Sequence, residues 1–296
     1  MLRLPGDTDS EYMELLFPFA YNILGSAEDA KDAVQDVVLK FYSIREKDIV
    51  DQRNYLIRAV INTAINIKSK KQNLQPGGLP WLPEPIVTDD TADKSLLLHD
   101  VLSYSLLVLM ERLNAKERAI FILKETFDYS HAEIAAFLDI SEEHSRKLLS
   151  RAKASLFKPA RRKTEKEAHH EREVISRFMN AIRKRDIQQL ENAMTADIRF
   201  YADGGGKVPL LATKSRGSAE IATLVIKAYY NYLQSAQFCF VQVNHQPALL
   251  TYRNGELNSC LVFDLQPETD RILQISAVMD PAKLRSLLQR PLIDGM

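Results

Sequence analysis

The spacing of apolar residues changes along this 296-residue chain, and that change limits the possible folds more than any other feature. From Ser10 to about Phe157, apolar residues recur at intervals of three and four, which is the period of an amphipathic helix. After about Gln237 they form short runs separated by the turn sequences "RNGE" and "PETD", which is typical of strands in a meander. Helices are also expected at 171–184, 187–194 and 218–235. We therefore predict a multi-domain protein, with two all-α domains followed by a separately folded α+β domain.

Two stretches interrupt these patterns and mark boundaries between domains. "GGLPWLPEP", from Gly77 to Pro85, contains three prolines and two glycines, which break both helices and strands. "KPARRKTEKEAHHERE", from Lys158 to Glu173, is highly charged and almost free of apolar residues. The predicted parts are a helical domain at 1–74, a linker at 75–95, a second helical domain at 96–160, a charged connector at 161–170 and an α+β domain at 171–290.

The linker contains the only tryptophan of the chain, Trp81, between Leu79 and Leu82. Linkers are usually polar, because exposed apolar surface gains nothing in water. This composition favours a linker that is covered by another surface of the protein. The alternative is that Trp81 packs against its own helical domain.

Charge and cysteine content exclude several classes of protein. Lysine and arginine number 39, as do aspartate and glutamate, so a nucleic-acid partner must be bound by a local basic surface. Cys239 and Cys260 match neither a disulfide framework nor a zinc motif, and we expect no metal and no other cofactor. No apolar run approaches the roughly 20 residues that span a bilayer, and the N-terminus lacks the apolar core of a signal peptide. We therefore expect a cytoplasmic protein with no membrane partner.

"YSHAEIAAFLDISEEHSRKLLSRAKASL", from Tyr129 to Leu156, has the pattern of a helix-turn-helix, with Ser141 as the cap of its second helix. In such motifs the second helix enters the major groove and its first residues reach the base edges. Positions 145–163 contain eight basic residues and no carboxylate, which supplies positive charge for phosphate groups. The alternative is a pair of packed helices with a solvated charged face.

Three stretches before the charged connector resemble parts of a bacterial RNA polymerase sigma factor. "AEDAKDAVQDVVLKFY" and "NYLIRAVINTAINIKSKKQ", at 27–42 and 54–72, resemble sigma region two, and the helix-turn-helix resembles region four. Their order and the short linker between them are similar to those of the extracytoplasmic-function (ECF) group. The resemblance covers about Ser10 to Phe157. It implies a protein that binds core RNA polymerase, recognises the minus-ten and minus-thirty-five promoter elements and initiates transcription.

The resemblance also implies roles for individual residues. A face for the polymerase clamp helices is implied at Asp32, Gln35, Asp36 and Lys40, whose helical spacing puts them on one side. Contact with the minus-ten element is implied for Arg58, Asn62, Asn66, Lys68, Lys70 and Lys71. Contact with the minus-thirty-five element is implied for Glu142, Glu143, His144, Arg146 and Lys147, with Arg151 and Lys153 on phosphate. Without the family, these sets are ordinary solvated faces. Ser145 stands where the family usually has a branched apolar residue.

The segment from Glu171 to about Leu288 resembles a SnoaL-like domain, the cone-shaped α+β fold shared with polyketide cyclases and ketosteroid isomerase. The resemblance rests on "WLPEP" in the linker, "DGGGK" at 203–207 and "DPAKL" at 280–284. Sigma factors with this extension form a subgroup in which it acts as a built-in regulator, usually with Asn where this chain has Asp280. We therefore expect the domain to contact the linker and the sigma core, through Trp81, Leu82, Pro83, Glu84, Pro85, Asp203, Gly204, Gly205, Gly206, Lys207, Asp280, Pro281, Lys283 and Leu284.

Two other functions are compatible with the same sequence. One is an isomerase or hydratase of the SnoaL fold, fused to a DNA-binding regulator. Asp203, His245 and Asp264 are its candidate proton-transfer groups by residue type, and this reading predicts a desolvated carboxylate in an apolar pocket. Asp203 can equally make a turn bond beside the three glycines. The other function is a LuxR-like regulator that binds DNA without joining the polymerase. The pocket of the cone-shaped domain can also bind a small-molecule ligand, but the sequence does not identify one. Among these functions, the resemblance favours a sigma factor without catalysis.

Overall fold

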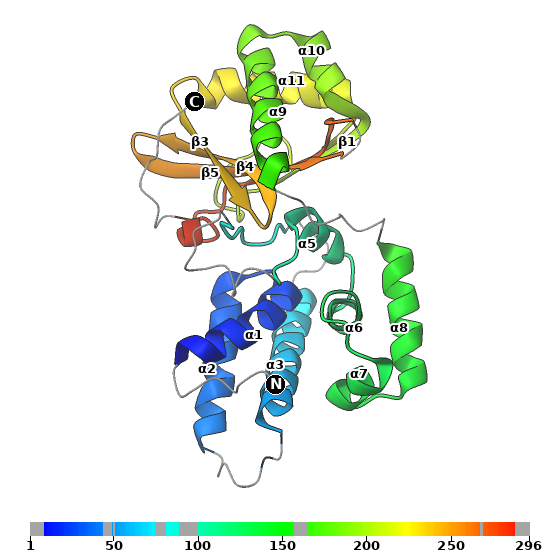
Figure 1. The fold of residues 1–296 in the computed structure, drawn as a ribbon. Coiled ribbons are helices and arrows are strands. Elements are labelled where there is room, and N and C mark those ends of the chain that lie inside the picture. The colour runs from blue at the N-terminus through cyan, green and yellow to red at the C-terminus, as the bar shows by residue number, and fades with distance from the viewer. Residues whose placement is uncertain are drawn as a thin grey trace. The chain divides into compact units, whose positions relative to one another are not determined.

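The computed structural model describes residues 9–43, 49, 51–74, 81–88, 100–156, 165–266 and 269–287. These residues form two compact units, drawn together in Figure 1. The first unit contains the described residues up to 74 and those of 100–156 other than 103–105. The second contains residues 81–88, 103–105 and the described residues from 165 onward. The middle of the predicted linker therefore groups with the C-terminal unit, while its two ends lie outside the described residues.

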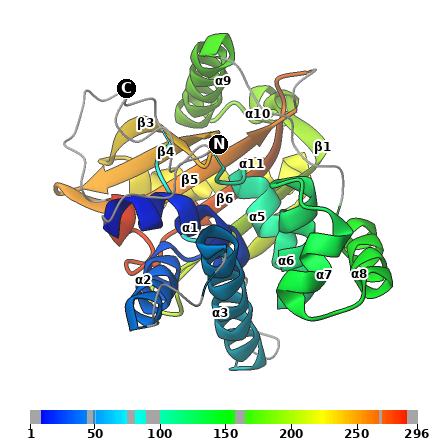
Figure 2. The same ribbon diagram turned by 60° about the horizontal axis from the view of Figure 1, so that its bottom comes forward.

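Three long helices begin the first unit: α1 (Asp9–Leu24), α2 (Ala27–Ser43) and α3 (Gln52–Leu74) (Figure 2). Each buries the side whose apolar residues recur at helical spacing, and α1 packs against both of the others. The helix predicted at 54–72 is thus confirmed, with two further residues at each end. Among the described residues, no helix is both long and apolar enough to cross a membrane.

Four shorter helices follow: α5 (Tyr104–Met110), whose first two residues belong to the second unit, α6 (Ala115–Glu125), α7 (His131–Leu138) and α8 (Glu142–Ser155). Capping boxes begin α6 and α7, because Asn114 and Ser130 each exchange hydrogen bonds with a glutamate three residues later. Asp139, at φ 52°, takes the left-handed conformation that ends α7 and turns the chain into α8. The predicted helix-turn-helix is therefore formed.

The second unit consists of a six-stranded sheet with helices packed on it. Its helices are α9 (Glu165–Lys184), α10 (Ile187–Ala193) and α11 (Ser218–Ala228), the last continuing as the π-helical turn η2 (Tyr229–Leu233), with a short 3₁₀ helix η3 (Arg285–Leu287) near the end. The strands are β1 (Met194–Asp203), β2 (Lys214–Arg216), β3 (Gln237–Val243), β4 (Gln246–Arg253), β5 (Glu256–Leu265) and β6 (Ile272–Val278).

The order of the strands is β2-β1-β6-β5-β4-β3. Strands β3 to β6 form the predicted antiparallel meander, so the α+β expectation is confirmed. Strand β1 lies parallel to β6, which brings Asp203, the last residue of β1, opposite Val278. The segments that follow these two strands, "DGGGK" and "DPAKL", therefore start side by side. The periodicity of the sequence did not predict β2 or this parallel pairing.

The core of the second unit lies between the sheet and α9 and α11. Phe178 of α9 and Phe263 of β5 are both buried and meet edge to face, with ring centroids 6.0 Å apart. Ile221 of α11 and Ile198 of β1 are fully buried in the same cluster. This packing fixes the end of β1, where the linker is bound.

Candidate functional site

An ion pair at the end of β1 holds the linker. Asp203 is 6% exposed, and its Oδ2 accepts hydrogen bonds from Lys283 Nζ at 2.6 Å and from the backbone N–H of Leu82 at 2.8 Å. Lys283 Nζ also donates to the carbonyl oxygen of Leu82 at 2.5 Å and lies 4.1 Å from the centre of the Trp81 ring. We call this group, consisting of Trp81, Leu82, Asp203 and Lys283, the linker clamp. Each backbone polar group of Leu82 has a charged partner in it.

The loop after Asp203 is shaped by close contact with Asp280. Gly205 has φ +62°, and a Cβ added to it would lie 2.4 Å from Asp280 Cγ, so the position requires glycine. The second oxygen of Asp203 accepts from Gly205 N at 2.8 Å, which is the turn bond considered above, so one carboxylate serves both the turn and the linker. Asp280 in turn accepts from Ala282 N at 3.0 Å, a bond that the Asn usual in the family can also accept. The two motifs "DGGGK" and "DPAKL" thus form one structure, although Lys207 at the end of the first is exposed.

Beyond the clamp, the linker runs along the edge of the sheet at β3. The N–H of Thr88 donates to Gln242 O at 2.8 Å. The carbonyl oxygen of Ile86 accepts from the N–H of Asn244 at 2.8 Å, and the N–H of Ile86 donates to Asn244 Oδ1 at 3.0 Å. A bridge between Val87 and β3 completes the pairing. The linker therefore covers part of an edge strand in the way that a bound peptide adds a strand to a sheet.

The middle of the linker is buried as well. Leu82, Pro83, Glu84 and Pro85 are all buried, and Trp81 is half-buried. The carbonyl oxygen of Pro83 accepts from Tyr104 Oη at 2.6 Å, and that of Pro85 accepts from the hydroxyl of Ser286 at 3.1 Å. Within the second unit the linker is thus in contact with Asp203 and Lys283 of the predicted domain set.

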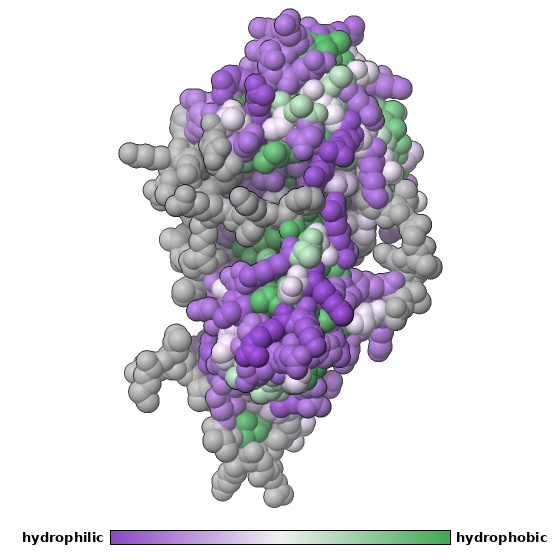
Figure 3. All heavy atoms as spheres, turned by 90° about the vertical axis from the view of Figure 1, so that its right-hand side faces the viewer, coloured by the Kyte–Doolittle hydropathy of each residue, from purple (hydrophilic) through white to green (hydrophobic). Residues whose placement is uncertain are grey.

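The second helix of the helix-turn-helix presents a polar face to solvent (Figure 3). Every residue predicted to contact the minus-thirty-five element is exposed: Glu142, Glu143, His144, Arg146, Lys147, Arg151 and Lys153. Arg146 and Lys147 pair with the glutamates four residues before them, each at 2.6 Å, and both pairs are exposed. Exposed pairs of this kind contribute little to stability and exchange easily for phosphate or base contacts.

Ser145, the departure from the family pattern, is fully buried between α7 and α8 and makes a specific contact. Its hydroxyl lies 2.8 Å from Nδ1 of His131 on α7. Burial, together with the nearby Arg146 guanidinium, lowers the pKa of His131 below its ordinary value. Ser145 thus contributes a polar contact between α7 and α8, and the burial of His131 and the nearby Arg146 favour the neutral histidine. The sequence did not indicate this partner.

The α3 residues predicted to contact the minus-ten element fall into two groups. Arg58, Asn66, Lys70 and Lys71 are exposed, and Lys71 pairs with Asp29 at 2.5 Å. Asn62 donates to the carbonyl oxygen of Phe137 at 3.0 Å. Lys68 is only 4% exposed, so it is not accessible to DNA in this conformation.

The partners of Lys68 explain its burial. Its Nζ contacts Glu111 at 2.6 Å and the carbonyl oxygen of Leu24 at 3.2 Å. Glu111 also pairs with Arg118, which is fully buried and donates from Nε to Asn22 O at 2.8 Å. One carboxylate therefore balances two buried cations in the first unit. A partner 43 residues away cannot be found from the spacing within a helix.

The face predicted to bind polymerase is exposed along α2. Asp32, Gln35, Asp36 and Lys40 are all exposed and share one side of the helix, as their spacing predicts. Leu39 and Tyr42, which were not predicted, add apolar surface beside them, with 67% and 53% of their area exposed. Exposed large apolar side chains beside a polar stripe are typical of a protein-binding surface.

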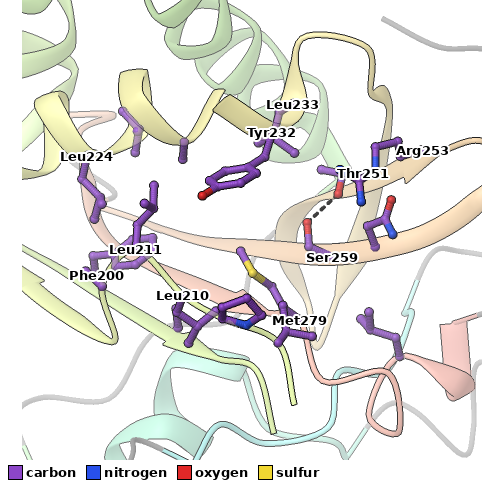
Figure 4. Close-up of a pocket in the computed structure, with 18 of the residues that line it drawn as sticks. Phe200, Leu210, Leu211, Leu224, Tyr232, Leu233, Thr251, Arg253, Ser259 and Met279 are labelled. Carbon is purple, nitrogen blue, oxygen red and sulfur yellow. Dashed lines mark hydrogen bonds between the residues drawn. The ribbon is translucent and has the colours of Figure 1, made fainter. Parts of the chain in front are cut away.

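A cavity of about 490 Å³ lies in the second unit between α11, η2 and the sheet (Figure 4). The described residues that line it include no carboxylate, histidine or cysteine. The three candidate proton-transfer residues lie elsewhere: Asp203 is in the linker clamp, His245 is exposed in the turn between β3 and β4, and Asp264 accepts from Gln246 at 2.7 Å. The desolvated carboxylate that the enzyme alternative predicts is thus not among the residues lining this cavity.

Comparison with known proteins matches both halves of the helical unit. The family model Sigma-70 region 2 matches residues 10–73, and Sigma-70 region 4 matches residues 103–156. The chain is 30% identical to the ECF RNA polymerase sigma factor SigJ of Mycobacterium tuberculosis over 222 residues, which cover 73% of this chain and 70% of that protein. It is 25% identical to the ECF sigma factor SigG of the same species, over 91% of this chain and 79% of the relative. The crystal structure of M. tuberculosis SigJ has the same fold, with a TM-score of 0.73 and 24% identity over 94% of this chain and 99% of that one.

Proposed function

The chain belongs to the ECF family of RNA polymerase sigma factors, and from this premise we propose how its own residues perform promoter-directed transcription initiation. The exposed stripe on α2, with Leu39 and Tyr42 beside it, binds core RNA polymerase. The first turns of α8 read the minus-thirty-five element, while Arg151 and Lys153 contact phosphate. The exposure of all seven predicted α8 residues supports this assignment.

Helix α3 contacts the minus-ten element in the same proposal. Arg58, Asn66, Lys70 and Lys71 are accessible to DNA in the present conformation. Lys68 and Asn62 join them only when their contacts with Glu111 and Phe137 are broken. Promoter binding is therefore coupled to a rearrangement within the helical unit, at the cost of separating a buried ion pair.

The C-terminal unit regulates the factor in cis by holding the linker. The observation that carries this proposal is the linker clamp, in which Asp203 and Lys283 bind both backbone polar groups of Leu82. Fixing residues 81–88 limits the separations and orientations that regions two and four can adopt. Since the polymerase and the promoter impose their own spacing on those regions, the clamp restrains initiation and its release favours it. The regulatory contact requires no catalysis, and the factor acts in the cytoplasm on core polymerase and promoter DNA.

The test is transcription with purified components. The full chain is added to core polymerase with a template library, and run-off products are compared with those from core polymerase alone. We expect promoter-specific products that disappear when the α8 residues Arg146 and Lys147 are both changed to alanine. The matched control changes Lys214 and Lys227, two residues of the second unit, to alanine and retains the products. Specific DNA binding that needs no core polymerase, without run-off products, would instead support the LuxR-like alternative.

A further inference from the structure

The cavity of the second unit has the size and lining of a ligand site. Its volume of about 490 Å³ lies within the range of about 300–1,000 Å³ that is usual for small-molecule pockets. Apolar side chains from three directions line it: Leu224 from α11, Leu210 from the loop before β2, and Met279 after β6 (Figure 4). Tyr232 projects from η2 toward the middle of the cavity. The walls therefore suit a small and mainly apolar molecule.

A β-bulge places a buried polar group in this apolar wall. Thr251 pairs with Ser259 and Tyr252 pairs with Leu257, so Asn258 is an extra residue in β5. Because of the bulge, the consecutive residues Leu257, Asn258 and Ser259 all line the cavity, which the alternation of a regular strand would prevent. Bulges commonly redirect side chains next to binding sites.

The polar groups at this end define what they can bind. Asn258 Oδ1 is buried and has no hydrogen-bond partner among the residues that the structure describes. Thr251 and Ser259 satisfy each other through a hydroxyl–hydroxyl bond of 2.5 Å. The Arg253 guanidinium, two residues along β4 from Thr251, supplies donors at the rim. A buried acceptor without a partner is costly, and a ligand that donates to it removes that cost.

We propose that this cavity binds a small apolar molecule with a hydroxyl group. The hydroxyl donates to Asn258 Oδ1 and accepts from the Arg253 guanidinium, while the apolar body packs between Leu224 and Met279. The described lining residues include no carboxylate, histidine or cysteine, so the contacts proposed for the ligand are hydrogen bonds and apolar packing.

The cavity shares its walls with the linker clamp. Met279, Pro281 and Leu284 line the cavity, while Asp280 and Lys283 between them hold the glycine loop and the linker. Ligand contacts with Pro281 and Leu284 therefore bear on the segment that positions Lys283. We infer that occupancy shifts the binding of the linker, and by thermodynamic reciprocity that release of the linker shifts ligand affinity. This coupling rests on the proposed regulatory role of the clamp, whereas the site itself does not.

Calorimetric titration of the full chain with 2-naphthol and with 2-methoxynaphthalene, which lacks the hydroxyl donor, tests the site. We expect 2-naphthol to bind about tenfold more tightly, the worth of one hydrogen bond to a buried acceptor. Asn258→Leu should abolish the preference, and the cavity-filling Leu224→Trp should abolish binding of both probes. Asn192→Leu, which changes an exposed asparagine outside the cavity, is the matched control and should keep the preference.

Three results would overturn the proposal that this cavity is a ligand site. These are the absence of binding by either probe up to its solubility, a preference that survives in Asn258→Leu, and binding that develops only in a chain ending at Leu287. The last result would make the chain's own tail the occupant. Coupling is tested separately by amide exchange of Thr88 with and without saturating 2-naphthol. An unchanged rate would refute coupling and leave the ligand site intact. The proposed regulation in cis is tested apart from both, and it fails if clamp variants leave transcription unaltered.

Discussion

Replacing Asp203 by alanine should release the linker from the C-terminal unit. The side chains of Asp203 and Lys283 are 7% and 12% exposed, so the substitution leaves a largely buried ammonium without its carboxylate. Removal of one partner from a buried ion pair costs about 3–5 kcal/mol. Lys283 still donates to the carbonyl oxygen of Leu82 and still lies over the Trp81 ring. We therefore expect a cost at the lower end of this range, about 3 kcal/mol. The equilibrium for linker release should then rise about 100-fold, because each 1.4 kcal/mol is a factor of ten.

Amide hydrogen exchange at Thr88 measures this release, because the substitution removes no hydrogen bond of Thr88 itself. The N–H of Thr88 donates to Gln242 O, a bond that does not include Asp203. Its protection should fall about 100-fold, while amides in the core of β5 keep theirs. Trp81 provides a second readout, since it is the only tryptophan, and its emission should move to longer wavelength. Asp197→Ala, an exposed aspartate in the same strand, is the control. Unchanged protection at Thr88 in Asp203→Ala would refute the claim that the ion pair holds the linker.

Three further predictions concern the helical unit. Glu111→Ala removes the carboxylate that the buried Lys68 and Arg118 share and should lower the free energy of urea unfolding by about 3 kcal/mol. Arg151→Ala should weaken promoter binding by the polymerase complex and reduce the slope of log affinity against log salt by about 1, since one phosphate contact is lost. The lowered pKa of His131 means that the unfolded state binds more protons, so stability should fall as the pH drops from about 7.5 to about 5.5. His131→Gln should remove that part of the pH dependence, and an equal slope in both proteins would contradict the assignment.

The sequence predicted most features that depend on local periodicity or on turn chemistry. The helices, the helix-turn-helix and the antiparallel meander follow from the spacing of apolar residues and of turn residues that are close together in the sequence. The turn bond of Asp203, one of the two alternatives for this residue, is present, and Gly205 beside it needs both a positive φ and room for Asp280.

The features that the sequence did not predict depend on partners far apart in the chain. From the sequence, Lys68 is expected to be exposed. In the structure it is buried beside Glu111, which comes 43 residues later. The parallel pairing of β1 with β6 brings Asp203 to Lys283 across 80 residues, and no periodicity encodes that. The cavity's polar end results from a bulge at Asn258, which a run of alternating residues does not reveal.

Single-round run-off transcription by core polymerase with wild-type chain or Lys283→Met tests the central claim most directly. Methionine keeps most of the apolar stem of Lys283 and removes the ammonium that contacts Asp203 and Leu82. We predict more transcript from Lys283→Met than from wild-type chain at the same promoter, with faster exchange at Thr88 in the same preparation. Equal transcript from the two proteins, with the linker shown to be released, would contradict the claim that the clamp regulates initiation.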